Sequence, residues 1–252
     1  MEESLIPPDQ EPVEICLLAG KIMLQSGAET YRVEDTMTRL AASLGLPGSQ
    51  SYVTPTGIVF QSGEMQWAKL IRIVERTTDL EKVAAVNNVS RQLGNGTLSP
   101  EAAYQQLVRI DTSRHAYPLP LQIVAAAVAS GCFTFMFGGV GKDLLPGILC
   151  GGLGFAAFLW LHRLVRVKFF AEFTASLMIG IVAYLLVQTQ LGTTLDKIII
   201  GSVMPLVPGL LITNAVRDLM AGHLVSGLSR GAEAFLTAFA IGAGIAVVFT
   251  VL

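Results

Sequence analysis

Charged residues are scarce in this sequence, and cysteine is scarcer. Asp, Glu, Lys and Arg make up 14% of the 252 residues, whereas a soluble domain usually carries about 25%. The chain therefore has too little polar surface for a protein that is wholly exposed to water. Its three cysteines lack metal-type spacing, so we expect no zinc site, no disulfide framework and no cofactor. No basic cluster indicates nucleic acid, and the acidic first 14 residues do not have the pattern of a secretory signal.

The scarcity of charge is confined to one part of the chain. Residues 1–118 contain 10 Lys and Arg residues and 14 Asp and Glu residues. Residues 119–252 contain only 7 Lys and Arg residues and 5 Asp and Glu residues. This contrast predicts two domains, a cytosolic α+β domain over 1–118 and a transmembrane domain over 119–252. The predicted fold class is therefore a polytopic α-helical membrane protein with an N-terminal cytosolic α+β domain.

Five apolar stretches in the second part are long enough to cross a bilayer. A hydrocarbon core about 30 Å thick requires about 20 helical residues. The predicted spans are 119–137, 144–161, 169–187, 198–216 and 234–252. Small residues such as Gly147 and Gly151 form a GxxxG pair, which indicates close packing between membrane helices.

Basic residues predict the orientation of these spans. If the N-terminal domain is cytosolic, the outer flanks contain only Lys142 and Lys197. The inner flanks then contain Arg109, Arg114, Arg163, Arg166, Lys168, Arg217 and Arg230. This bias agrees with the positive-inside rule, so we expect a multi-pass protein of the cell membrane with a cytosolic N-terminus and an external C-terminus.

The fourth predicted span contains a break. Gly201, Pro205, Pro208 and Gly209 lie within nine residues, and each proline removes a backbone donor and disturbs the preceding helical turn. Broken helices of this kind form midplane substrate sites in many transporters, because their ends present dipoles to the solute. A purely structural kink is the alternative.

Polar residues follow this break. Asn214 and Asp218 are four residues apart and share a helix face, with Arg217 beside them. We interpret them as substrate-site candidates, although Arg217 alone would serve as an inner-face anchor and Asp218 as its ion-pair partner. Glu172 lies one turn inside the third span, and with Asp218 it is a candidate for proton coupling. The alternative for Glu172 is solvation at the membrane interface.

The N-terminal domain is predicted to mix helices and strands. Apolar spacing predicts a first helix over 11–25, and Ser26 to Glu29 matches a capping box that would start a second helix ending near Gly45. Residues 50–61 are expected to form two short strands or a hairpin, and residues 66–74 a third strand. Further helices are expected over 81–93, after a second capping box from Thr78 to Glu81, and over 100–111, after Ser99.

The second helix carries a charged face formed by Glu29, Arg32, Glu34, Asp35 and Arg39. The domain has no nucleophile–histidine pair, no P-loop and no dinucleotide-binding glycine motif, so we do not expect an enzyme. The charged face is either solvated or docked against the cytosolic end of the membrane part.

Several motifs together resemble the threonine/serine exporter family. They are the segment 24–37 (LQSGAETYRVEDTM), 53–57 (VTPTG), 205–214 (PLVPGLLITN), Arg217-Asp218 and 226–230 (SGLSR). The resemblance implies an ion-driven secondary exporter of small amino acids or, in a two-component branch, of dicarboxylates such as succinate. Glu29, Arg32, Glu34 and Asp35 match the charged positions of the family's N-terminal motif. Pro205, Pro208, Gly209, Asn214, Arg217 and Asp218 match its membrane motif.

The resemblance also implies a partner. Full-length family members carry a second helical block, so this chain is expected to be the large subunit of the split form. A small membrane subunit, or a second copy of the chain, would supply the missing helices in the lipid bilayer. Two other functions stay open: a membrane-anchored hydrolase acting through the cytosolic domain, and a regulatory or sensor subunit of a transporter.

Overall fold

The computed structural model describes residues 11–63, 67–113, 117–165, 167 and 169–251. The contacts between residues divide the chain into two compact units. We name them the α/β unit, which comprises residues 1–116 with 212–231, and the apolar unit, which comprises residues 117–211 with 232–252. The division differs from the predicted boundary near 118, because a segment from the second half of the sequence belongs to the first unit.

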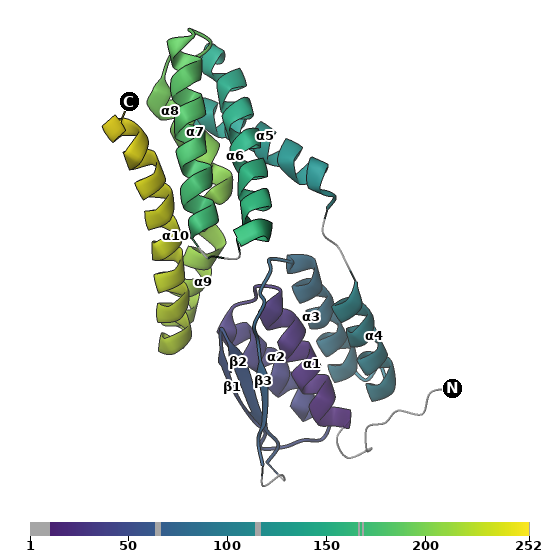
Figure 1. The fold of residues 1–252 in the computed structure, drawn as a ribbon. Helices are drawn as coiled ribbons and strands as arrows, with labels where there is room; N and C mark the ends of the chain where they lie inside the picture. Colours follow the sequence, from purple (N-terminus) through teal and green to yellow (C-terminus); the bar gives the residue numbers. More distant parts are fainter. Residues whose placement is uncertain (1–10, 64–66, 114–116, 166, 168, 252) are drawn as a thin grey trace. The chain divides into compact units, whose positions relative to one another are not determined.

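The α/β unit places two central helices between a small sheet and two further helices (Figure 1). The helices α1 (Glu11–Gln25) and α2 (Thr30–Ser43) are central, with α3 (Leu80–Gly94) and α4 (Pro100–Thr112) on one side. Antiparallel strands β1 (Gln50–Thr54), β2 (Gly57–Gln61) and β3 (Lys69–Arg72) form the sheet. The predicted first helix, the hairpin within 50–61 and the strand within 66–74 are confirmed.

Local chemistry explains where these elements begin and end. Ser99 accepts a hydrogen bond from the Ala102 N–H and starts α4, as predicted. Gly45 adopts a φ of +74° just after α2, a conformation that favours glycine. The β1 and β2 strands join through a two-residue turn, and their inward residues Val53, Ile58 and Phe60 enter the buried core. That alternation places one face of the sheet on α1 and α2.

Two predicted capping boxes are wrong. Glu29 is itself the N-cap of α2, and neither its side chain nor that of Ser26 closes the box, because the Glu29 carboxylate binds arginines instead. At the start of α3 the cap is Asp79, not Thr78, and its carboxylate accepts from the Lys82 N–H.

The apolar unit is a bundle of apolar helices, most of them of membrane length. Its helices α5 (Leu119–Met136), α6 (Leu144–Val165), α7 (Phe170–Gln188) and α8 (Leu195–Val203) pack against one another, with a short 3-10 helix η1 (Gly141–Asp143) before α6. Among the described residues, four helices are long and apolar enough to cross a membrane: α5, α6 with η1, α7 and α10 (Leu224–Val251). Three of the basic residues used to predict orientation, Arg114, Arg166 and Lys168, lie outside the described residues.

Glycines allow these helices to approach closely, as the GxxxG pair predicts. A Cβ atom at Gly147 would meet Thr134 of α5, and one at Gly151 would meet Ser130. At Gly201 of α8 a Cβ would lie 2.5 Å from the Thr134 backbone nitrogen. The packing of α5 against α6 and α8 therefore requires the absence of side chains at these positions.

The fourth predicted span is not one helix. The helix α8 ends at Val203, a 3-10 turn η2 (Met204–Leu206) follows, and α9 (Gly209–Met220) starts after Pro208. The two halves are bent by 61°. The last helix also starts earlier than the predicted 234, at Leu224, because Gly222 adopts a φ of +87° and ends the turn that follows α9. The boundary between the two units falls inside α9 and again inside α10.

Candidate functional site

A buried carboxylate from the second half of the sequence caps the second helix. Asp218 of α9 accepts hydrogen bonds from the Thr30 backbone N–H at 2.8 Å and from the Thr30 hydroxyl at 3.1 Å. Thr30 is the first residue of α2, so its N–H has no partner within the helix. Asp218 therefore supplies the N-terminal cap that residues 26–29 do not provide, and its negative charge also suits the positive end of the helix dipole.

The same carboxylate faces a buried arginine. Arg230 Nε of α10 lies 3.5 Å from Asp218 Oδ2, and the side chains are 3% and 0% exposed. A terminal nitrogen of Arg230 donates to the Ala28 carbonyl at 2.8 Å. A buried ion pair adds little net stability, but removing one partner leaves a buried charge and costs about 3–5 kcal/mol. Asp218 and Arg230 must therefore be present together.

Glu29 binds two arginines at the edge of this buried pair. Its Oε1 accepts from Arg217 at 2.5 Å, and its Oε2 accepts from Arg32 at 3.2 Å. Burial acts to raise the pKa of Glu29, but its own backbone N–H, the hydrogen bond from Arg217 and the charge of Arg32 together lower it. Glu29 is consequently ionised at neutral pH. Its side chain is nearly buried, whereas those of both arginines are about half exposed.

Glu34 and Ser226 cover the outer edge of β1. The Val53 backbone N–H donates to Glu34 Oε1 at 2.8 Å, and the Ser226 hydroxyl donates to the Val53 carbonyl at 3.3 Å. His223 Nδ1 lies 3.9 Å from the same Glu34 oxygen. Burial raises the pKa of Glu34, and the Val53 N–H and His223 only partly oppose this. Both outward backbone groups of Val53 are thus paired with side chains.

Asn214 completes the junction. Its side-chain amide donates to the Gly27 carbonyl at 2.9 Å, and Gly27 has a φ of +89° in the turn between α1 and α2. The motif over 24–37 and the motifs over 214–230 therefore form one polar cluster inside the α/β unit. We call it the α2 junction and define it by Glu29, Thr30, Asn214, Arg217, Asp218 and Arg230.

The structure brings together some predicted site residues and not others. Glu29, Arg32, Asn214, Arg217 and Asp218 meet at the α2 junction, and Glu34 lies beside it. For the charged face of α2, Glu29 and Glu34 are docked against residues of 212–231. Asp35 instead pairs with Arg39 on the exposed surface, at 3.1 Å.

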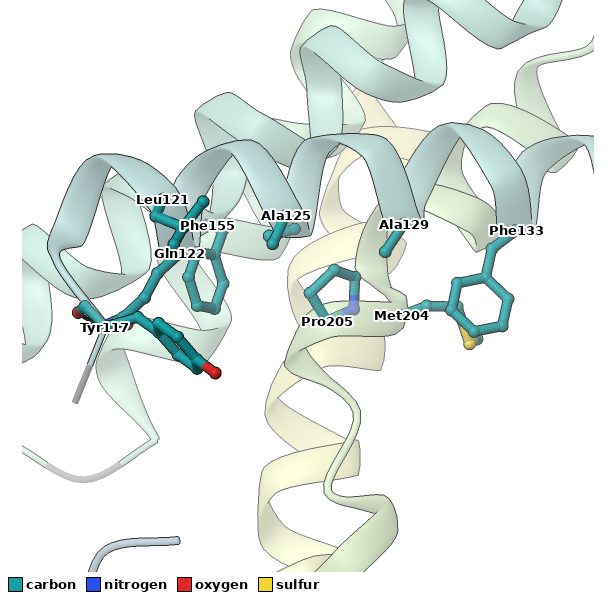
Figure 2. A pocket seen from close by; sticks show the side chains of 10 residues that line it. Tyr117, Leu121, Gln122, Ala125, Ala129, Phe133, Phe155, Met204 and Pro205 are labelled. Carbon is teal, nitrogen blue, oxygen red and sulfur yellow. Dashed lines mark hydrogen bonds between the residues drawn. The ribbon is translucent and has the colours of Figure 1, made fainter. Parts of the chain in front are cut away.

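The three helix-breaking residues lie elsewhere. Pro205 belongs to the apolar unit and lines a pocket of about 630 Å³ with α5 residues such as Ala125 and Ala129 (Figure 2). Met204 and Phe133 lie at one end of the labelled lining, and Tyr117 and Gln122 lie at the other (Figure 2). No charged side chain of the described residues lines this pocket. It therefore suits an apolar group and not a carboxylate.

The break itself is compact. The Met204 N–H donates to the Gly201 carbonyl, and the Val207 N–H donates to the Met204 carbonyl at 3.2 Å. The chain is then extended at Val207 before Pro208 and Gly209 start α9. The 3-10 turn thus satisfies one carbonyl of the last turn of α8 and one carbonyl that follows the helix.

The proton-coupling candidates have different surroundings. Both Asp218 oxygens are engaged by Thr30, as described above. Glu172 lies in the first turn of α7, and its Oε2 atom is buried without a hydrogen-bond partner among the residues that the structure describes. The described part of the chain contains no group of three His, Cys, Asp or Glu side chains that could hold a metal ion.

Sequence reasoning missed two features. Thr30 and Arg230 received no individual role, although both lie in the motifs that carry the family resemblance. Asp143 was also missed: it is buried and accepts from the Thr193 N–H at 2.6 Å, from the Thr194 N–H at 3.2 Å and from both threonine hydroxyls. Asp143 joins the turn between α5 and α6 to the start of α8. Its partners are about 50 residues away, so no local pattern signals the contact.

The comparisons with known proteins cover nearly the whole chain. The sequence profile of ThrE, described as "Putative threonine/serine exporter", matches residues 14–252. This chain belongs to the threonine/serine exporter family. The match includes both motifs that meet at the α2 junction, and with the apolar helices it identifies a multi-pass membrane protein.

Two curated proteins similar to this exporter-family chain are named as transporter subunits. The "Probable succinate transporter subunit YjjP" of Klebsiella aerogenes is 25% identical over 94% of this chain and 92% of its own length. The protein of the same name in Escherichia coli is 24% identical over 94% of this chain and 93% of its own length. The "Pheromone-regulated membrane protein 10" of Kluyveromyces lactis is 26% identical over 89% of this chain but 24% of its own length. No solved structure matches the chain.

Proposed function

We propose that this chain is a subunit of a secondary transporter that exports a small carboxylate-bearing metabolite from the cytosol. The observation that carries the proposal is the end-to-end similarity to succinate transporter subunits within an exporter family. The substrate is a dicarboxylate such as succinate, or threonine or serine, and an ion gradient drives export.

The α2 junction supports a topology of five crossings with the α/β unit in the cytosol. Three membrane-length helices, α5, α6 and α7, separate the N-terminal part of this unit from residues 212–231, which return to it through Asn214, Asp218 and Ser226. A chain that returns to the same side must cross an even number of times. The segment from α8 to the start of α9, residues 195–211, then makes the fourth crossing, and the part of α10 after residue 231 carries the C-terminus to the outside.

The residues have distinct roles in this proposal. Arg217, half exposed at the α2 junction, attracts the substrate carboxylate, because a guanidinium binds carboxylates through charge-assisted hydrogen bonds. Pro205, Pro208 and Gly209 provide the break between α8 and α9, where the pocket lined by Pro205 accommodates the apolar part of the solute. Asn214 adds an amide at the α2 junction. Of the two proton-coupling candidates, Glu172 has a buried carboxylate oxygen with no hydrogen-bond partner among the described residues, whereas the Asp218 carboxylate caps α2.

A small membrane subunit completes the transporter. The two relatives that match over nearly their whole length are themselves named subunits, and this supports a partner that supplies further helices. A second copy of the chain is the alternative source of those helices.

Counterflow in proteoliposomes tests the function. Labelled succinate, threonine and serine are offered to the chain alone, to the chain with the small membrane protein encoded beside it, and to that protein alone. Uptake only by the pair is the expected result. Uptake by the chain alone would replace the partner by a homo-oligomer, and uptake by the small protein alone would make this chain a regulatory subunit. No uptake in any combination would refute the exporter.

Arg217→Ala tests the proposed substrate cation. Export should be lost while the protein still inserts into the membrane. Arg72→Ala, which removes an exposed arginine from β3 of the same unit, is the matched control and should export normally. Normal export by Arg217→Ala would remove Arg217 from the mechanism.

A further inference from the structure

We propose that Glu29 is an internal ligand that occupies the carboxylate site of the α2 junction, and that a carboxylate of the transported solute competes with it for Arg217 and Arg32. The inference rests on the proposed function. It adds that the Glu29 side chain closes the anion site until a solute carboxylate displaces it, and we call this side chain the latch.

The Glu29 carboxylate is held in the geometry of a bound ligand. One carboxylate bridges two guanidinium groups, with Oε1 2.5 Å from Arg217 and Oε2 3.2 Å from Arg32. This is the arrangement in which arginines bind the carboxylate of a ligand. The side chains of Arg217 and Arg32 are 55% and 41% exposed, whereas that of Glu29 is 6% exposed. A carboxylate arriving from water therefore meets the cations before it meets Glu29.

The charges around Glu29 do not balance. Arg217 and Arg32 carry two positive charges, and Glu29 carries one negative charge. The neighbouring Asp218 does not compensate the excess, because its own partner is the buried Arg230. A positive charge thus remains at the half-exposed edge of the junction. The site favours a further anion, and a guanidinium has five N–H donors with which to hold it.

The Glu29 carboxylate does not cap α2. Glu29 occupies the N-cap position of α2, where a side chain usually accepts from the first turn, but its side chain forms no such bond. Asp218 caps the helix instead, through Thr30. The carboxylate of Glu29 can therefore leave its arginines without uncapping α2.

The test compares Glu29→Gln with the wild type in the full chain and its membrane partner. Glutamine keeps the size of the side chain but removes the competing charge. A charge-assisted hydrogen bond contributes about 1.5 kcal/mol or more, so the KM for succinate in counterflow should fall about tenfold. Glu29→Asp, which is one methylene too short to reach both arginines, should have an intermediate KM. Glu101→Gln, at the exposed N-terminal turn of α4, is the matched control and should leave the KM unchanged.

The outcomes separate the two proposals. An unchanged or raised KM in Glu29→Gln, with transport by the wild type, overturns the latch and leaves the exporter standing. No transport by the wild type in any combination overturns the exporter. In that case calorimetric titration of succinate into the purified chain still tests the latch. Equal affinities of Glu29→Gln, Glu29→Asp and the wild type for succinate overturn it. Adding Arg217→Ala to Glu29→Gln must abolish the gain in affinity, since the gain requires the guanidinium.

Discussion

The buried pair of Asp218 and Arg230 leads to a quantitative prediction about the α2 junction. Replacing Asp218 by Asn keeps one oxygen as an acceptor for Thr30 but removes the charge that faces Arg230, whose side chain is 3% exposed. Leaving a buried charge without its partner costs about 3–5 kcal/mol. Because the asparagine oxygen still accepts from Thr30, we expect the lower end of this range, about 3 kcal/mol.

The loss should appear as undocking of residues 212–231 from the rest of the α/β unit. Ser226 is buried against Val53, so Ser226→Cys places a thiol that reacts only when this segment leaves β1. The exposed Cys132 is replaced by Ser in the same chain. Buried Cys16 remains as an internal reporter of global unfolding, because burial raises its thiol pKa to about 12 and keeps it unreactive in the folded unit.

Labelling by a thiol reagent, read by peptide mass spectrometry, then measures the opening equilibrium. At 1.4 kcal/mol per factor of ten, Asp218→Asn should speed labelling at position 226 about 10²-fold, with Cys16 still protected. Adding Arg230→Met removes the stranded charge and should restore most of the protection. Asp196→Asn, which alters an exposed pair with Lys197, should change nothing. Labelling of Asp218→Asn at the wild-type rate would refute the assigned role of the pair.

Three further predictions concern stability in detergent, measured as Tm. Gly201→Ala should cost about 1–3 kcal/mol, because the added Cβ would lie 2.5 Å from the Thr134 backbone nitrogen. Gly242→Ala is the control and should be neutral or slightly stabilising, because its Cβ would meet no neighbouring atom within 4 Å. Equal Tm values for the two variants would contradict the close packing at Gly201. Glu29→Gln should lower Tm at pH 7.5, because the pKa of Glu29 is lowered in the folded protein and the ionised carboxylate therefore adds stability above the ordinary pKa of 4.5. The difference in Tm between variant and wild type should vanish as the pH falls through the folded pKa. A difference that does not depend on pH would exclude the ion pairs as its source. Asp143→Ala leaves the Val140, Thr193 and Thr194 N–H groups without their acceptor and should lower the free energy of unfolding by about 3 kcal/mol. A loss of stability no larger than that of Asp196→Ala would show that water replaces the carboxylate.

Much of the local structure could be predicted because it depends on neighbours in the sequence. The helix over 11–25, the hairpin within 50–61, the Ser99 cap and the apolar spans follow from periodicity, turn residues and hydropathy. The two prolines predicted the break after α8, and the spacing of Asn214 and Asp218 placed them on one buried face of α9.

The α2 junction could not be derived in the same way. Thr30 and Asp218 are 188 residues apart, and no periodicity links them. The acid at Glu29 matched a capping box by spacing alone, but the tertiary contact with Arg217 changed its role. Asp143 has the same character, since its threonine partners lie about 50 residues further along the chain. Contacts of this kind require the fold.

The contribution of residues 212–231 to the α/β unit has a consequence for the order of biosynthesis. The ribosome makes roughly 100 residues between Ala116 and Ile212, which takes about 5–20 s at typical elongation rates. Through that interval the Thr30 N–H and the outer edge of β1 lack the Asp218 and Ser226 side chains that cover them in the finished protein. The first helices and strands to be synthesised are therefore completed only after α5, α6 and α7 have emerged, so insertion of the membrane helices governs maturation of the N-terminal unit.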